Sequence, residues 1–173
     1  MTSWDTRRIL RELADADRRR AVLLAFWKGA DLQSKVLATA QLAKALHFRE
    51  ETIRKMPAGK KADLLATRIG SHEFEQFHDA ALLQFHTRER AAMMAAFLDY
   101  WNVPHVNGTI EADDYAAPSE EQVRAAVAAL GEAYDRRDVA LYLATAGLLM
   151  GDDWRAAAWP VVDEIAAGLS EAE

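Results

Sequence analysis

The chain has 173 residues, no cysteine and a formal net charge of −6. A chain of this length buries about two-thirds of its unfolded surface, so it needs neither disulfides nor a metal ion to form a core. The lack of cysteine excludes disulfides, zinc-thiolate sites, iron–sulfur clusters and thiol nucleophiles. The negative charge argues against nucleic acid as a partner.

The N-terminal residues are charged and mixed, and no apolar segment with a small-residue cleavage site follows them. We therefore expect no signal peptide and a cytoplasmic protein. The longest apolar runs, at 21–27, 91–98 and 139–143, are far shorter than the roughly 20 residues that a membrane span requires. We interpret them as buried helices and expect no membrane partner.

Charge is distributed unevenly along the chain. Residues 1–108 hold 17 Lys and Arg against 13 Asp and Glu, whereas residues 109–173 hold 4 against 14. We favour the interpretation that the two segments attract each other within the folded protein or within an oligomer. The alternative is that the basic segment 47–68 binds an anionic ligand.

Three helices are predicted in the first 46 residues. The first begins at Ser3 or Asp5, the second covers 17–28 and is apolar all round, and the third begins at the N-cap residue Asp31. The residues expected to face inward on the first and third helices are Ile9, Leu10, Leu13, Leu32, Val36, Ala40, Ala43 and Leu46.

A break at 55–61 separates these helices from three more, with expected ranges 62–69, 71–86 and 87–101. The last of them begins at Thr87 and has little polar surface, so we expect it at the centre of the core. The other segments expected there are 18–28 and 138–150.

Residues 102–118 form the main connection. They contain the turn-forming pair Asn107-Gly108, which is compatible with a short hairpin flanked by Val106 and Ile110. Three helices are predicted after this loop, and Pro160 should kink or restart the last one. Their expected ranges are 119–134, 138–150 and 152–169.

No segment alternates apolar and polar residues as a half-buried strand does. The sequence therefore predicts an all-α fold, either a helical bundle or an orthogonal helical array of about seven to nine helices. We expect a single helical domain over 1–173. Within it, a basic segment of residues 1–101 and an acidic segment of residues 119–173 are joined by the loop 102–118.

Side chains suited to catalysis are densest at 71–86, where three of the five histidines lie. Glu75 and His78 share a helix face, and His86 returns close to that face almost three turns later. Such a face can hold a divalent metal. The Glu75-x-x-His78 spacing resembles part of the site of di-iron carboxylate four-helix bundles. Those bundles use two such pairs and two further glutamates, and this chain has one pair.

A second resemblance is to the all-helical metal-dependent phosphohydrolases that carry an adjacent His-Asp pair. His47, the His78-Asp79 pair and either Asp135 or Asp138 occur in the order of the metal ligands of that family. The resemblance implies a metal-dependent hydrolase centred on His78 and Asp79 as catalytic candidates. The candidate metal ligands from both patterns are His47, Glu75, His78, Asp79 and His86.

We favour a simpler interpretation, in which the histidines of 71–86 are helix-surface or partly buried polar groups. No complete catalytic set is present, and no cofactor is predicted. The sequence favours a non-catalytic interaction or regulatory protein that binds a protein partner or associates with itself. Its support is the charge asymmetry and an interface position for Trp4, Trp154 and Trp159, near the chain ends. The metal-dependent hydrolase is the alternative.

Overall fold

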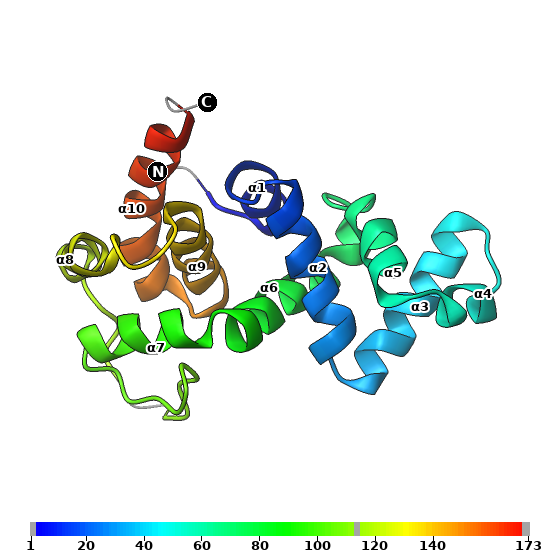
Figure 1. Cartoon of the computed structure of the whole chain (residues 1–173), viewed down its shortest axis with the longest axis horizontal. Coiled ribbons are helices and arrows are strands. Elements are labelled where there is room, and N and C mark those ends of the chain that lie inside the picture. The colour runs from blue at the N-terminus through cyan, green and yellow to red at the C-terminus, as the bar shows by residue number, and fades with distance from the viewer. Residues whose placement is uncertain (1–2, 113–114, 171–173) are drawn as a thin grey trace. The chain divides into compact units, whose positions relative to one another are not determined.

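The computed structural model describes residues 3–112 and 115–170 (Figure 1). Within these ranges the chain forms ten α-helices, one π-helical turn and one 3-10 turn, and no strand. The predicted all-α class is confirmed, and the arrangement is consistent with a bundle or array. The helix beyond the expected seven to nine is α4 (Glu50–Lys55), which lies in a segment where the sequence showed no apolar periodicity.

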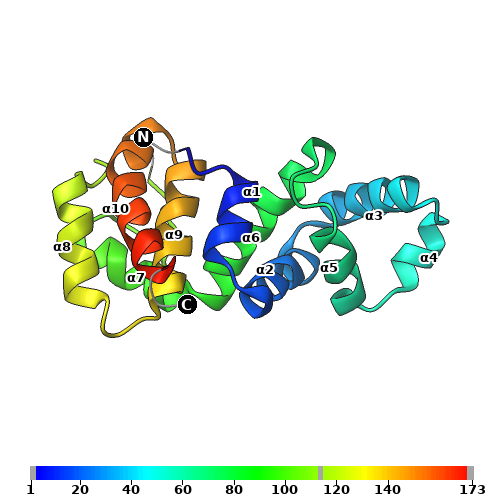
Figure 2. The same ribbon diagram turned by 90° about the horizontal axis from the view of Figure 1, so that it is seen from above.

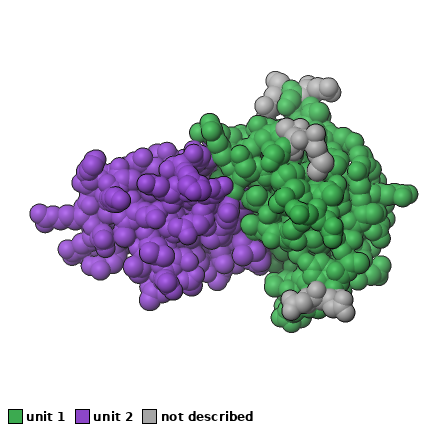
Figure 3. All heavy atoms as spheres, turned by 180° about the vertical axis from the view of Figure 1, so that it is seen from behind, with its two compact units in different colours: residues 1–14, 90–173 green, residues 15–89 purple. Residues whose placement is uncertain are grey.

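The helices group into two compact units, coloured separately in Figure 3. Unit 2 is the continuous segment Asp15–Glu89, and unit 1 combines the chain up to Ala14 with the chain from Arg90 onward. This division differs from the predicted segments 1–101 and 119–173, because the N-terminal segment and the helix after Arg90 associate with the C-terminal helices. The single domain over 1–173 stays a prediction.

Unit 2 is built around α2 (Ala16–Gly29), which packs against α5 (Ala58–Ala66) and α6 (Glu75–Glu89); the three helices lie side by side in Figures 1 and 2. Its aromatic centre is Phe26, whose ring meets those of Trp27 and Phe77 edge-on at centroid distances of 5.0 and 5.8 Å. Edge-on packing of this kind adds to the stabilisation from burial.

Two helix starts of unit 2 are capped by aspartate side chains, of which the cap at Asp31 was predicted. Asp15 accepts a hydrogen bond from the Arg18 backbone N–H, and Asp31 does the same for Ser34. These side chains satisfy N–H groups that lack partners in the first turn. Asp31 thereby begins α3 (Leu32–Leu46), as predicted, and a 3-10 turn, η2 (His72–Phe74), leads into α6.

Unit 1 combines a short N-terminal helical segment with four longer helices. The segment consists of α1 (Thr6–Arg8) and the π turn η1 (Ile9–Leu13), and it is capped by Asp5, one of its two predicted starts. Its three buried apolar residues are those expected from the sequence, and η1 packs on α9. The other helices are α7 (Ala91–Tyr100), α8 (Glu120–Leu130), α9 (Arg136–Leu149) and α10 (Asp152–Ser170).

The centre of unit 1 is α9, in which every residue from Asp138 to Gly147 is buried. It packs along α10, which also contacts α8 (Figure 2). The sequence prediction of a central helix over 138–150 is confirmed. The same prediction for 88–101 is wrong, because α7 buries only one stripe, formed by Met93, Phe97 and Leu98. Most of its alanines are half-buried or exposed.

Two predicted helix boundaries also change. Thr87 does not open a helix but lies inside α6, where its hydroxyl donates to the Leu83 carbonyl at 2.9 Å, and the break falls at Arg90. A threonine hydroxyl that bonds to a carbonyl of its own helix is compatible with the helix interior. Pro160 does not restart α10, which is continuous from Asp152 to Ser170.

The predicted turn at Asn107-Gly108 forms, but only as a minimal hairpin. Both residues have positive φ, 50° and 83°, as a tight two-residue hairpin turn requires. Val106 and Thr109 exchange two backbone hydrogen bonds of 2.8 and 3.0 Å, and they form the single isolated bridge of the described chain. The pairing does not extend to Ile110.

The interface position predicted for three tryptophans is wrong. Trp4, Trp154 and Trp159 are 0, 2 and 6% exposed and belong to the core of unit 1. Trp4 donates from Nε1 to Asp163 Oδ1 at 3.0 Å, and the Arg8 guanidinium covers its ring at 3.7 Å. These contacts fix the N-terminal segment to α10.

Among the helices of the described residues, none is long and apolar enough to cross a membrane.

Candidate functional site

The predicted metal ligands occupy different environments in unit 2. His78 is buried in α6, and its Nε2 lies 3.1 Å from the Leu65 carbonyl oxygen, to which the ring N–H donates. Burial lowers the pKa of His78 below its ordinary value of 6.5, against the opposing effects of the Leu65 carbonyl and the Glu75 carboxylate. The ring is therefore a neutral group joining α6 to α5.

The other predicted ligands do not surround His78. Glu75 is exposed and pairs with His72, with 3.0 Å between Oε2 and Nδ1. His86 is buried, and its ring lies edge-on to Phe85. His47 is exposed and ends α3 in a left-handed conformation, with φ 55° and ψ 35°.

The two later aspartates have structural partners within unit 1. Asp135 caps α9, and Asp138 accepts from Arg90 Nε at 3.0 Å. In residues 3–112 and 115–170, no group of three or more His, Asp or Glu side chains is arranged to hold a metal ion.

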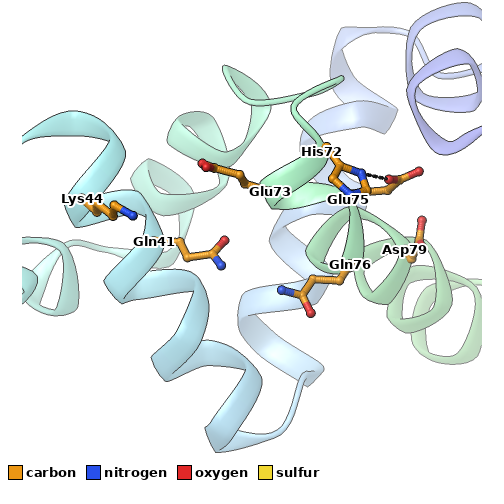
Figure 4. Close-up of a pocket in the computed structure, with 7 residues that line it drawn as sticks. All are labelled: Gln41, Lys44, His72, Glu73, Glu75, Gln76 and Asp79. Carbon is orange, nitrogen blue, oxygen red and sulfur yellow. Dashed lines mark hydrogen bonds and ion pairs between the residues drawn. The ribbon is translucent and has the colours of Figure 1, made fainter.

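A polar pocket of about 530 Å³ lies instead between α3 and the start of α6 (Figure 4). Gln41 and Lys44 of α3 form one wall, and η2 and α6 form the other. Figure 4 shows Glu73 and Gln76 directed toward α3, whereas the His72–Glu75 pair lies on the other side of α6. The lining residues are Gln41, Lys44, His72, Glu73, Glu75, Gln76 and Asp79.

The side chains that line this pocket are polar or charged, so a guest molecule bound there would be polar. The Oε1 atom of Gln41 is shielded from solvent and accepts no hydrogen bond. A shielded acceptor without a donor costs about 1–3 kcal/mol. Lys44 on one wall and Glu73 on the other form no ion pair with each other, so both charges are available to such a guest.

An apolar surface on α3 leads into the pocket. Leu32, Val36 and Leu37 are 78, 56 and 46% exposed. Leu37, Gln41 and Lys44 follow one another at the spacing of a single helix face, so Leu37 adjoins the pocket residues, while Leu32 and Val36 lie farther round the helix. We call the exposed side of α3, from Leu32 to Lys44, the α3 face.

The α3 face corrects the sequence interpretation of this helix. Leu32 and Val36 were expected inside, but the buried residues are Ala38, Thr39, Leu42 and Ala43. The helix carries apolar residues on two sides, and the small side chains of one side allow closer packing against the rest of unit 2. Leu42 is the one large apolar side chain on the buried side, whereas Leu32, Val36 and Leu37 are exposed.

No family model matches this chain, and comparison with curated proteins and with solved structures finds no similar protein. The function of the protein must therefore be inferred from its own residues.

No pattern in the sequence pointed directly to the pocket. Asp79 and Glu75 were singled out, but as partners of His78, which faces Leu65 instead. Gln41 and Lys44 come from a helix about thirty residues earlier in the chain, and glutamine and lysine form no recognisable spacing motif. The apolar residues on both sides of α3 were the one available signal for an exposed binding face.

Proposed function

We propose that the protein is a non-catalytic interaction protein whose α3 face binds an amphipathic helix of a partner protein. The observation that carries the proposal is the exposure of three large apolar side chains, Leu32, Val36 and Leu37, on a well-formed helix. Large apolar side chains gathered on one face are typical of helix-in-groove recognition, in which a partner contributes residues at spacings of three and four.

The charge of α3 indicates the chemistry of the partner. Its fifteen residues include Lys35 and Lys44 and no Asp or Glu. Lys44 lies on the α3 face and has no carboxylate partner among the described residues. Unit 2 as a whole holds 13 Lys and Arg against 10 acids. We therefore expect acidic residues beside the apolar row of the partner helix.

The test uses two synthetic helical peptides with the same apolar row and either Glu or Lys at the flanking positions. Binding is measured by fluorescence anisotropy. We expect the Glu peptide to bind at least about tenfold more tightly than the Lys peptide, because Lys44 attracts one and repels the other. The net charge of −6 on the whole chain acts in the opposite direction, so this preference requires a local site.

Val36→Asp and Val106→Asp form a matched pair of variants, because the two valines are 56 and 52% exposed and only Val36 lies on the α3 face. We expect Val36→Asp to weaken Glu-peptide binding at least about tenfold and Val106→Asp to leave it unchanged. Equal effects of the two variants, or tighter binding of the Lys peptide, would contradict the proposal. If light scattering shows a dimer, and only Val36→Asp dissociates it, the α3 face binds a second copy of the chain instead of a partner protein.

The alternative function, a metal-dependent hydrolase centred on His78 and Asp79, has a direct test of its own. Metal analysis of the purified protein should find a divalent metal, and His78→Ala should lose it. The bond from His78 to Leu65 and the position of Asp79 at the pocket do not favour this alternative. The α3 face is therefore the better-supported site.

A further inference from the structure

A small pocket lies in unit 1, where α8 ends and α9 begins. Its volume is about 280 Å³. Drug-sized ligands occupy pockets of about 300–1,000 Å³, so this pocket suits a smaller molecule. We call it the α8–α9 pocket. The residues that line it are Val127, Ala128, Gly131, Glu132, Arg136 and Val139.

Apolar groups line one part of the α8–α9 pocket. Val139 of α9 is 1% exposed and Val127 of α8 is half-buried, so both offer aliphatic surface next to the core of unit 1. Ala128 has a small side chain and Gly131 has none, which leaves room beside the valines. A short aliphatic group bound there leaves water for an apolar surface, and this transfer favours its binding.

Two side chains of opposite charge complete the lining of the pocket. Glu132 lies in the turn that follows α8, and Arg136 is the first residue of α9. Within the part of the chain that the structure describes, neither side chain forms an ion pair or a hydrogen bond, with the other or with a third residue. Both charges are therefore available to a guest in the pocket.

The guanidinium of Arg136 lies against α10. Its two terminal nitrogens are 3.4 and 3.7 Å from the place that a Cβ would take at Gly168, two residues before α10 ends at Ser170. The C-terminal end of a helix attracts cations, so this position stabilises the guanidinium. Arginine has five N–H donors, and the contact with Gly168 uses none of them in a hydrogen bond. These donors can therefore bind a carboxylate at the pocket.

We propose that the α8–α9 pocket binds a free amino acid with a short aliphatic side chain, such as valine. Arg136 binds the carboxylate of the amino acid, Glu132 binds its ammonium group, and the two valines contact its side chain. Glu132 repels a guest that is only an anion, and Arg136 repels one that is only a cation, whereas a zwitterion pairs with both. The pocket lies wholly in unit 1, so the proposal is independent of the α3 face in unit 2.

The test follows the backbone amide signals of residues 127–139 by nuclear magnetic resonance while L-valine is added to the full chain at constant pH and ionic strength. We expect shifts that saturate. Isovalerate lacks the ammonium group of valine, and isobutylamine lacks its carboxylate, but both keep its branched carbon chain. Each should bind at least about tenfold more weakly than valine, because each loses one charge-assisted contact with the pocket.

Arg136→Gln and Glu132→Gln should each weaken valine binding at least about tenfold, since each removes one charged partner of the zwitterion. Glu132→Gln should not weaken isovalerate binding, because here it removes a repulsion, and this result separates recognition of the ammonium group from a general loss of structure. The matched control is Glu121→Gln, which removes an exposed carboxylate of α8 outside the pocket and should change the affinity for valine by less than about twofold. Shifts that do not saturate, equal affinities for valine and isovalerate, or equal losses in Glu121→Gln and Glu132→Gln would overturn the proposal.

Discussion

The backbone carbonyl of Leu65 in α5 accepts a hydrogen bond from His78, which is almost completely buried in α6. This bond gives the imidazole a structural position in the core. Burial sets the balance of its charge states, because a protonated ring would lose its hydration without gaining a full counter-charge. His72, six residues earlier, has the same chemistry but is exposed and pairs with Glu75.

The burial of His78 predicts that the free energy of unfolding depends on pH. His78 titrates near 6.5 when unfolded and at a lower pH when folded. Between these two pKa values the unfolded chain binds more protons. The free energy of unfolding should therefore fall as the pH decreases from about 6.5 through the folded-state pKa, and this contribution should be constant below it. Urea unfolding at about pH 7.5 and at successively lower values down to about pH 4.5 measures the effect.

His78→Gln keeps an N–H donor for the Leu65 carbonyl and removes the titration, so its stability should depend less on pH over this range than that of the wild type. His72→Gln is the matched control, because it makes the same substitution at a side chain that is 97% exposed. Identical pH profiles for wild type and His78→Gln would show that His78 is not the titrating group.

At the scale of the elements, close approach of α9 and α10 depends on Gly147. A Cβ at this position would lie 2.4 Å from Trp159 Nε1 and 3.2 Å from the Arg155 Cα. Trp159 donates from this nitrogen to the Ala144 carbonyl at 3.3 Å, so the ring is held in place. The sequence contains no sign that a glycine within an apolar helix has this role.

Gly147→Ala should lower the free energy of unfolding by about 1–3 kcal/mol, since the clash with Trp159 outweighs the better helix propensity of alanine. Chemical denaturation measures the change. Gly168→Ala in α10 is the matched control. A Cβ there would meet only the flexible end of Arg136, at 3.4 Å, so we expect a gain of up to about 1 kcal/mol. Stabilisation by both substitutions would exclude the close contact at Gly147.

At the scale of the whole molecule, the two units differ in chain continuity and in charge. Unit 2 is one uninterrupted segment with its own aromatic centre. Unit 1 needs two separate segments, because Trp4, Ile9 and Leu10 fill its core from the N-terminal end. Unit 1 holds 8 Lys and Arg against 17 acids, whereas unit 2 holds 13 against 10, so the negative charge of the protein is concentrated in unit 1.

We expect the isolated segment 15–89 to fold alone, because its helices bury their apolar faces within the segment and its length suffices for a small core. Circular dichroism should show helix and a cooperative thermal transition. The segment 90–173 should not fold without residues 1–14, because it would lose the buried Trp4 ring and three further apolar residues. A folded 90–173 segment, or an unfolded 15–89 segment, would contradict this assignment of the cores.

The sequence by itself determined the all-α class, most helix boundaries and the N-cap at Asp31. These features depend on local periodicity and on hydrogen bonds within one turn, which neighbouring residues specify. It did not determine which side of α3 is buried, where the tryptophans near the chain ends lie, or that His78 faces Leu65. Only the tertiary structure decided these, because they depend on the size and position of groups from distant helices. The α3 face and the pocket are both of this second kind.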